Sequence, residues 1–354
     1  MTGAGKRAIL AGIMKKIVGV LTVVALVALV SSDSLDGQSR AGQAAPAAAA
    51  NNAAAATAIP RTADGKPDMQ GHWTNQTFTP LERPRDVDKE FFTPEEAAAW
   101  AKRGIDRIVD QPSVAEVTRD QEIHYDDAIW MLEGYQKGAM LRTSIITDPA
   151  DGRMPPLSAE GQRRAQERAA ARKQVDPFAS AQSRGLSERC IYWGHEGPPL
   201  LPTGYNSNLQ IVQSPGQFVV IPEMMSVARV IPTAPMPHLT AAIRPMRGDS
   251  RGRWDGDTFV AETTNYSEQT AWRGSSENLK VTERFTMVDA DTIRYQFTIE
   301  DPSTWTRPWS GEYTMHRIEG PLFEYACHEG NYGIVNILNG ARQAEAAAAQ
   351  SSTP

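Results

Sequence analysis

Apolar and polar residues alternate along several short segments in the second half of the chain. In residues 292–300 the apolar side chains occupy one face of an extended strand, and the polar side chains occupy the other. Residues 280–288 follow the same period, but Glu283 falls on the apolar face beside Phe285. The pattern predicts half-buried β-strands, one of which carries a carboxylate on the apolar side of the sheet.

Turn residues separate these segments at short intervals. Asp255-Gly256 predicts a hairpin over residues 251–264, residues 289–291 predict a second hairpin, and residues 319–321 predict a third. Strands that follow one another through short turns form a meander, and about eight of them can close into an up-and-down barrel. The other segments expected to form strands are residues 67–73, 210–221, 226–231, 311–317 and 322–327.

Helical signals are confined to the region before residue 180. Thr93-Pro94 provides a cap and a first-turn proline for a helix that runs to about residue 109. Further helices are predicted over residues 126–138 and 158–173. The chain is therefore expected to be mainly β, with a few helices inserted into a barrel.

The two ends of the chain have the composition of processing and linking segments. Basic residues precede an uncharged apolar run over residues 17–30, which is shorter than a membrane span of about 20 residues. An uncleaved anchor is the alternative to a signal peptide. We expect a periplasmic or secreted protein with a signal peptide (1–44), an Ala-rich linker (45–60), a single barrel domain (61–342) with a helical insertion at about 93–175, and a disordered tail (343–354).

Charge and motif content exclude several kinds of partner. The formal net charge is −6 and no basic stripe occurs, which disfavours binding to nucleic acid or to an anionic membrane surface. The sequence contains no glycine-rich nucleotide loop and none of the common zinc signatures. We therefore expect a small-molecule ligand and neither an organic cofactor nor a metal, while the oligomeric state is left open.

Two cysteines, Cys190 and Cys327, occur in a chain that is expected to be exported. An oxidising compartment favours a disulfide between them, and the alternative is that one is a nucleophile. A His-Glu-Gly sequence follows each cysteine, at His195 and at His328-Glu329. If the cysteines are bonded, the two His-Glu pairs lie near one site. There they could act as acid and base or bind a divalent ion. The alternative is that they only surround a structural disulfide.

Glu283 is the first candidate for acid–base chemistry. A carboxylate on an apolar face must be paired, hydrogen-bonded or protonated. Glu262 lies on the preceding predicted strand, so the two carboxylates could line a pocket; alternatively each pairs with an arginine, such as Arg284 or Arg307, and holds the barrel closed. The catalytic candidates are Glu283, His328, Glu329 and Arg307, the last of which would hold an anionic group.

Tryptophans gather close to arginines in the last third of the chain. Aromatic platforms beside arginine suit saccharides or flat amphipathic ligands, and they equally suit a barrel rim that is packed by its own aromatic residues. The candidate ligand-binding residues are Glu262, Trp272, Trp305, Trp309 and His195.

Several sequence runs carry a resemblance to known groups of proteins. Residues 61–68, 248–264 and 327–332 together resemble a large group of exported bacterial proteins without an established biochemical activity. That resemblance implies export and a single compact unit over residues 61–342, and it assigns no catalytic residue. Gly71-His72-Trp73 resembles the Gly-x-Trp of lipocalin-type barrels, although it stands more than a hundred residues before most of the other strands.

These observations lead to two hypotheses of different classes. The first is an exported, lipocalin-like barrel that binds a small amphipathic or saccharide-like ligand. The second is an enzyme on the same barrel, a hydrolase, lyase or isomerase that uses Glu and His as acid and base without a cofactor. A filled barrel would instead suit a structural protein of the cell envelope.

Overall fold

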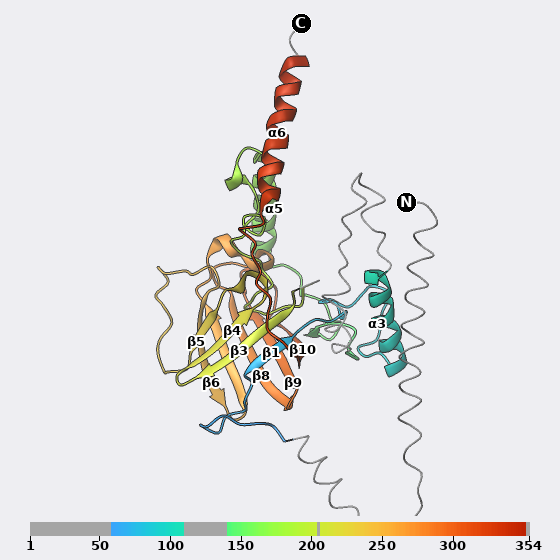
Figure 1. Ribbon diagram of the computed structural model, residues 1–354, viewed down its shortest axis with the longest axis vertical. Coiled ribbons are helices and arrows are strands. Elements are labelled where there is room, and N and C mark those ends of the chain that lie inside the picture. The colour runs from blue at the N-terminus through green and yellow to red at the C-terminus, as the bar shows by residue number, and fades with distance from the viewer. Residues whose placement is uncertain (1–57, 110–139, 204–205, 352–354) are drawn as a thin grey trace, which may run out of the picture. The chain divides into compact units, whose positions relative to one another are not determined.

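The computed structural model describes residues 58–109, 140–203 and 206–351. An antiparallel sheet dominates them, and its strands curve round a shared core (Figure 1). The mainly β prediction is confirmed. The strands are β1 (Gly71–Thr74), β2 (Ile146–Asp148), β3 (Asn208–Ser214), β4 (Gln217–Pro222), β5 (Arg229–Pro232), β6 (Asp249–Asp255), β7 (Thr258–Thr264), β8 (Lys280–Asp289), β9 (Thr292–Glu300) and β10 (Trp309–Arg317).

The strand order differs from a simple meander of about eight strands. Its order is β5-β4-β3-β1-β10-β9-β8-β7-β6, and β2 also pairs with β10. Two meanders, β3–β5 and β6–β10, are thus joined by β1, which inserts between β3 and β10. The two end strands, β5 and β6, lie side by side and are linked by a side-chain hydrogen bond from Arg229 Nε to Ser250 Oγ (3.1 Å), so the barrel is nearly closed.

Two of the three predicted hairpins are confirmed. β6 and β7 meet at Asp255-Gly256, where Gly256 adopts a φ of 61°, and β8 and β9 meet at residues 289–292. The third prediction is wrong, because residues 322–327 form no strand. Both edges of β10 are already occupied, by β9 on one side and by β1 and β2 on the other, so no edge remains for a following strand.

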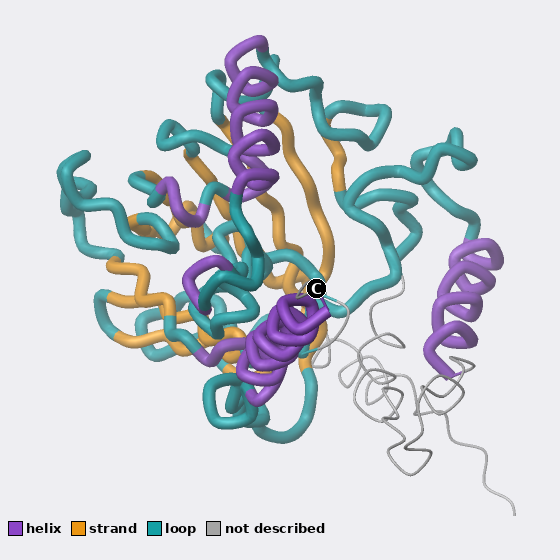
Figure 2. The backbone as a smooth tube through the Cα atoms, turned by 90° about the horizontal axis from the view of Figure 1, so that it is seen from above, coloured by secondary structure: helices purple, strands orange, loops and turns teal. Residues whose placement is uncertain are grey.

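Three α-helices, coloured purple in Figure 2, accompany the sheet in the described residues. Helix α3 (Pro94–Val109) begins after Thr93, whose hydroxyl accepts from the amide of Glu96, and α5 (Ala159–Gln174) begins after Ser158; both were predicted. Helix α6 (Tyr332–Ser351) was not predicted, and it replaces most of the expected disordered tail, because alanine-rich sequence favours helix.

Some sequence predictions fall outside the described residues. These are the signal peptide, most of the Ala-rich linker and the helix predicted over residues 126–138. Within the described part of the chain, none of the helices combines the length and the apolar character that a membrane span requires.

Aromatic side chains fill the barrel interior. Phe218 stacks on Phe259 with ring centroids 3.9 Å apart, and Phe285, Tyr295 and Phe297 continue the cluster. All five are buried, and the alternation in β8 and β9 predicts this for Phe285, Tyr295 and Phe297. A filled interior is the feature expected of a structural protein, so a binding function would need a cleft on the surface.

The tryptophan of the Gly-x-Trp motif belongs to this core. Trp73 on β1 is completely buried, its indole N–H donates to the carbonyl of Met69 (2.8 Å), and the guanidinium of Arg317 lies 4.3 Å from its ring centroid. The tryptophan of this motif is therefore a core residue on the first strand of the barrel.

Candidate ligand-binding site

Glu283 lies inside the barrel and forms an ion pair with Arg229. Arg229 Nη1 donates to Glu283 Oε1 (3.0 Å), and its Nη2 contacts the second carboxylate oxygen. The Tyr295 hydroxyl also donates to Glu283 Oε1 (2.8 Å). Glu283 is 0% exposed, so the prediction that it sits on the apolar face is confirmed, and its partner is Arg229 rather than Arg284 or Arg307.

The other donors of Arg229 tie this pair to neighbouring strands. Its Nε donates to Ser250 (3.1 Å) and its Nη2 to Thr263 (3.0 Å), and these two hydroxyls lie 2.9 Å apart. Arg229, Ser250, Thr263, Glu283 and Tyr295 come from β5, β6, β7, β8 and β9 respectively. The cluster therefore crosses the seam between β5 and β6 and closes the barrel.

Residues 197–201 pack into the same end of the barrel. The amide of Leu200 donates to the Tyr295 hydroxyl (2.9 Å), while its carbonyl accepts from Tyr313 (3.1 Å). Burial, followed by the charge of Glu283, raises the pKa of Tyr295, so it stays protonated and can donate. With every polar group of this cluster paired and covered, we interpret Glu283 as a structural residue.

Glu196 is a second buried carboxylate at this end. It accepts from the amide of Trp193 (2.8 Å) and from Arg247 Nε (3.0 Å). Burial raises the pKa of Glu196, while the hydrogen bond and charge of Arg247 act in the opposite direction. The Arg247 guanidinium also lies over the ring of Tyr192 (5.4 Å), whose pKa burial raises to about 12. These contacts fix the position of the segment that carries His195.

A surface cleft of about 400 Å³ opens beside this segment. Two of the predicted ligand-binding residues, His195 and Trp272, lie in its wall. The volume falls in the range that small-molecule sites occupy. The cleft is lined by Tyr192, Gly194, His195, Gln269, Thr270, Ala271, Trp272 and Arg273.

Arg273 supplies the cationic group of the cleft. It adopts a φ of 49° inside a tight turn, in which the amide of Gly274 donates to Ala271 O (3.3 Å). Such a conformation costs a non-glycine residue about 1 kcal/mol or more. The turn holds the guanidinium over the ring of Trp272, 5.4 Å from the centroid. Among the described residues it has no hydrogen-bond or ion-pair partner, so its donors remain available to a ligand.

His195 is neutral at physiological pH. Burial, and then the charge of Arg273, lower its pKa below the usual 6.5. Its Nδ1 atom is buried and finds no hydrogen-bond partner within the described part of the chain. The cleft therefore combines one cation, a neutral imidazole, a largely buried aromatic wall and the exposed amide of Gln269.

The three predicted tryptophans are all buried, and one of them also lines the cleft. Trp309 is fully buried, stacks on Trp272 (centroids 5.8 Å apart, planes at 22°) and meets Trp305 edge to face (5.8 Å). Trp305 and Trp309 thus pack against other aromatic residues at the barrel rim. This is the second of the two alternatives that the sequence left open. Trp272 belongs to this stack and also lines the cleft.

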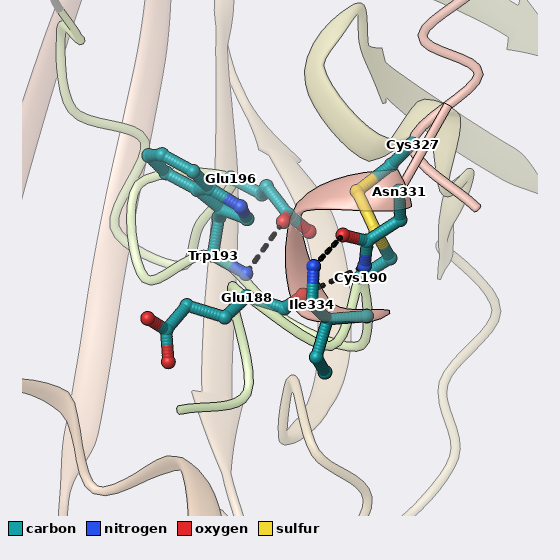
Figure 3. Close-up of a disulfide and its surroundings, with 7 residues drawn as sticks. All are labelled: Glu188, Cys190, Trp193, Glu196, Cys327, Asn331 and Ile334. Carbon is teal, nitrogen blue, oxygen red and sulfur yellow. Dashed lines mark hydrogen bonds between the residues drawn. A yellow bond between two sulfur atoms is a disulfide. The ribbon is translucent and has the colours of Figure 1, made fainter. Parts of the chain in front are cut away.

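Cys190 and Cys327 form the predicted disulfide, with Cα atoms 5.7 Å apart (Figure 3). Asn331, at the start of α6, donates to the carbonyl of Glu188 (2.8 Å), so this bond and the disulfide both fasten the C-terminal segment. His328 and Glu329 are exposed, and neither lines the cleft at His195. The twin His-Glu site is therefore not assembled.

The remaining candidates lie on the outer surface. Arg307 is half-exposed and pairs with Asp148 (2.6 Å). Glu262 pairs with Lys280 (2.7 Å), whose hydrogen bond lowers the pKa of Glu262. The register places Ala261, not Glu262, opposite Glu283, so the two glutamates face opposite sides of the sheet. The pocket expected between them does not form.

Two arginines that matter most were not among the predicted site residues, although Arg273 was noted beside the tryptophans. Arg229 and Ile231 share the buried face of the short strand β5. An arginine on an apolar face was the sequence signal that could have identified the partner of Glu283. Arg273 directly follows Trp272, but its left-handed backbone in a short turn has no period that a sequence pattern can reveal.

The fold and the cleft define a nearly closed antiparallel β-barrel protein with a cationic, aromatic-walled hollow at one end. The sequence matches no protein-family model and no curated protein. Functional inference therefore rests on the chemistry of the cleft.

Proposed function

We propose that this protein binds a small amphipathic or saccharide-like ligand that carries an anionic group, in the cleft formed by His195, Trp272 and Arg273. The observation that carries the proposal is the guanidinium of Arg273, held over an aromatic ring by a left-handed turn and free of ion-pair partners within the described residues. A planar cation in that position suits a carboxylate, sulfonate or phosphate.

The other wall groups limit the body of the ligand. Trp272 is 6% exposed and contributes a small apolar surface, and the exposed Gln269 side chain offers an amide, whereas the Thr270 hydroxyl is buried and donates to the carbonyl of Met246 (2.5 Å). Aromatic side chains favour flat or ring-shaped ligands, whose polar edge the Gln269 amide can bind. Since His195 and Tyr192 are neutral near pH 7, Arg273 is the one charged side chain among the described residues that line the cleft.

The location proposed for this activity is the periplasm or the exterior of the cell. The disulfide between Cys190 and Cys327 suits an oxidising compartment. The signal-peptide composition of residues 1–44 supports the same location.

An enzymatic role receives less support than binding. Acid–base catalysis needs two groups of suitable protonation within reach of one reacting bond. The described lining of the cleft contains one imidazole and no carboxylate, and Glu283 is sealed within its pair with Arg229. We therefore favour a binding protein.

The test uses two dyes that share an aromatic framework and differ in charge. 8-Anilino-1-naphthalenesulfonate is an amphipathic anion, and N-phenyl-1-naphthylamine is its uncharged analogue. Loss of a half-exposed charged contact in Arg273→Gln should cost about 1 kcal/mol, or about fivefold in Kd for the anion, with little change for the neutral dye.

Arg307→Gln is the matched control, because it removes an arginine whose partner, Asp148, lies on the outer surface. We expect this variant to bind both dyes as the wild type does. Equal affinity of wild type and Arg273→Gln for the anionic dye would refute the proposed site.

A further inference from the structure

A second hollow, of about 570 Å³, lies at the opposite end of the barrel. Trp254 in its wall precedes the β6–β7 turn, whereas Trp272 lies in the β7–β8 connection. Successive turns of an antiparallel meander fall at opposite ends, so the two hollows are separate. We call the second one the Trp254 groove. It lies between the segment over residues 61–70 and the β3–β4 turn.

The segment over residues 61–70 is firmly held. Both nitrogens of the Arg61 fork donate to the carboxylate of Asp257 (2.9 and 2.6 Å), which fastens the segment to the β6–β7 turn. The Gln213 side chain accepts from the amide of Met69 (2.6 Å) and donates to the carbonyl of Pro67 (3.1 Å). One wall of the groove is therefore formed before any ligand arrives, which lowers the entropic cost of binding.

The polar groups of the groove are carboxylates, amides and hydroxyls. Asp64 and Asp68 each use one carboxylate oxygen in a local hydrogen bond, with Thr62 and with Gln70 respectively. Their second oxygens have no hydrogen-bond partner among the described residues. The exposed amide of Gln217 and the hydroxyl of Thr233 also line the hollow.

The charge balance differs from that of the first cleft. Arg61, the one cation among the described lining residues, is paired with Asp257, and the Lys66 ammonium lies over the Trp254 ring, 5.7 Å from its centroid, while the two carboxylates disfavour an anionic ligand. Trp254 contributes a half-buried ring, fixed edge-on against Phe259 (5.3 Å). Neutral sugars bind to an aromatic side chain that is flanked by carboxylates and amides. The C–H face of the sugar packs on the aromatic ring, and the sugar hydroxyls donate hydrogen bonds to the carboxylates.

From these features we infer a second binding site, for a neutral saccharide, in the Trp254 groove. The inference is independent of the function proposed for the first cleft, because the two sites share no lining residue. Either site can fail its test without affecting the other.

The test is saturation-transfer NMR on the full chain with cellobiose and maltose as probes. At least one disaccharide should receive saturation from the protein. The double variant Asp64→Asn/Asp68→Asn should weaken its binding about fivefold or more, since hydrogen bonds to charged groups are the strong ones. Trp254→Leu should abolish the transfer.

Asp151→Asn/Asp176→Asn is the matched control, because it changes the charge equally at exposed sites outside the groove. Circular dichroism confirms that each variant is folded before it is compared. Absence of transfer to both sugars, or equal transfer to the wild type and the Asp64→Asn/Asp68→Asn variant, would overturn the inference.

Discussion

The buried pair of Arg229 and Glu283 gives the sharpest prediction about stability. Glu283→Gln leaves the guanidinium charge buried without its counter-charge, and Arg229→Met leaves the carboxylate in the same position. Arg229 is 6% exposed and Glu283 0% exposed, so solvent cannot compensate either loss. Each single change should lower the free energy of unfolding by about 3–5 kcal/mol, the usual cost of breaking a buried ion pair.

The double variant Arg229→Met/Glu283→Leu should be much less destabilised than the sum of the single changes. Apolar replacement of a buried pair is often neutral, and the Ser250 and Thr263 hydroxyls keep each other as partners at 2.9 Å. We expect a total loss within about 2 kcal/mol, hence a coupling energy of several kcal/mol by double-mutant cycle.

The assay is urea unfolding at pH 7, followed by tryptophan fluorescence with the disulfide intact. Arg284→Gln is the internal control, because it stands next to Glu283 on β8 but breaks an exposed pair with Asp255, which should cost less than about 1 kcal/mol. Single-variant losses no larger than that of Arg284→Gln, or strictly additive losses, would refute a seam held by the buried pair.

Three further predictions concern the cleft and the disulfide. In NMR titration His195 should have a pKa below 6.5, and Arg273→Gln should raise it because a nearby positive charge is lost; an unchanged value would contradict their proximity. Because the folded-state pKa of His195 is depressed, the unfolded chain binds more protons than the folded chain as pH falls below about 7. The free energy of unfolding should therefore decrease as pH falls. Urea midpoints compared across pH should show a less steep decrease for His195→Gln. Reducing the Cys190–Cys327 bond should lower the free energy of unfolding by up to about 5 kcal/mol, from the entropy of a 137-residue loop, and an unchanged urea midpoint would argue against this.

Local periodicity predicted the strands and the inward position of Glu283, because each follows from residues close in sequence. The strand order did not follow, since β1 pairs with β3 and β10 across more than 130 residues. Likewise Arg229 and Glu283 are 54 positions apart, and no local rule specifies which arginine closes the pair.

The candidate site was only partly foreseen, for a related reason. His195 and Trp272 were identified by residue type, and they meet in one cleft. Arg273 was left out because its role depends on a left-handed turn. The predicted catalytic residues do not come together in one site. The disulfide joins Cys190 and Cys327, but His328 and Glu329 do not line the cleft.

The most direct test of the proposed ligand site is a ¹H–¹⁵N spectrum of the tryptophan indole groups during titration with 8-anilino-1-naphthalenesulfonate. The Trp272 signal, assigned with Trp272→Phe, should shift in step with dye binding, while the signal of Trp73, buried in the barrel core, should stay in place. A titration in which the dye binds and Trp272 does not move would contradict the proposed site.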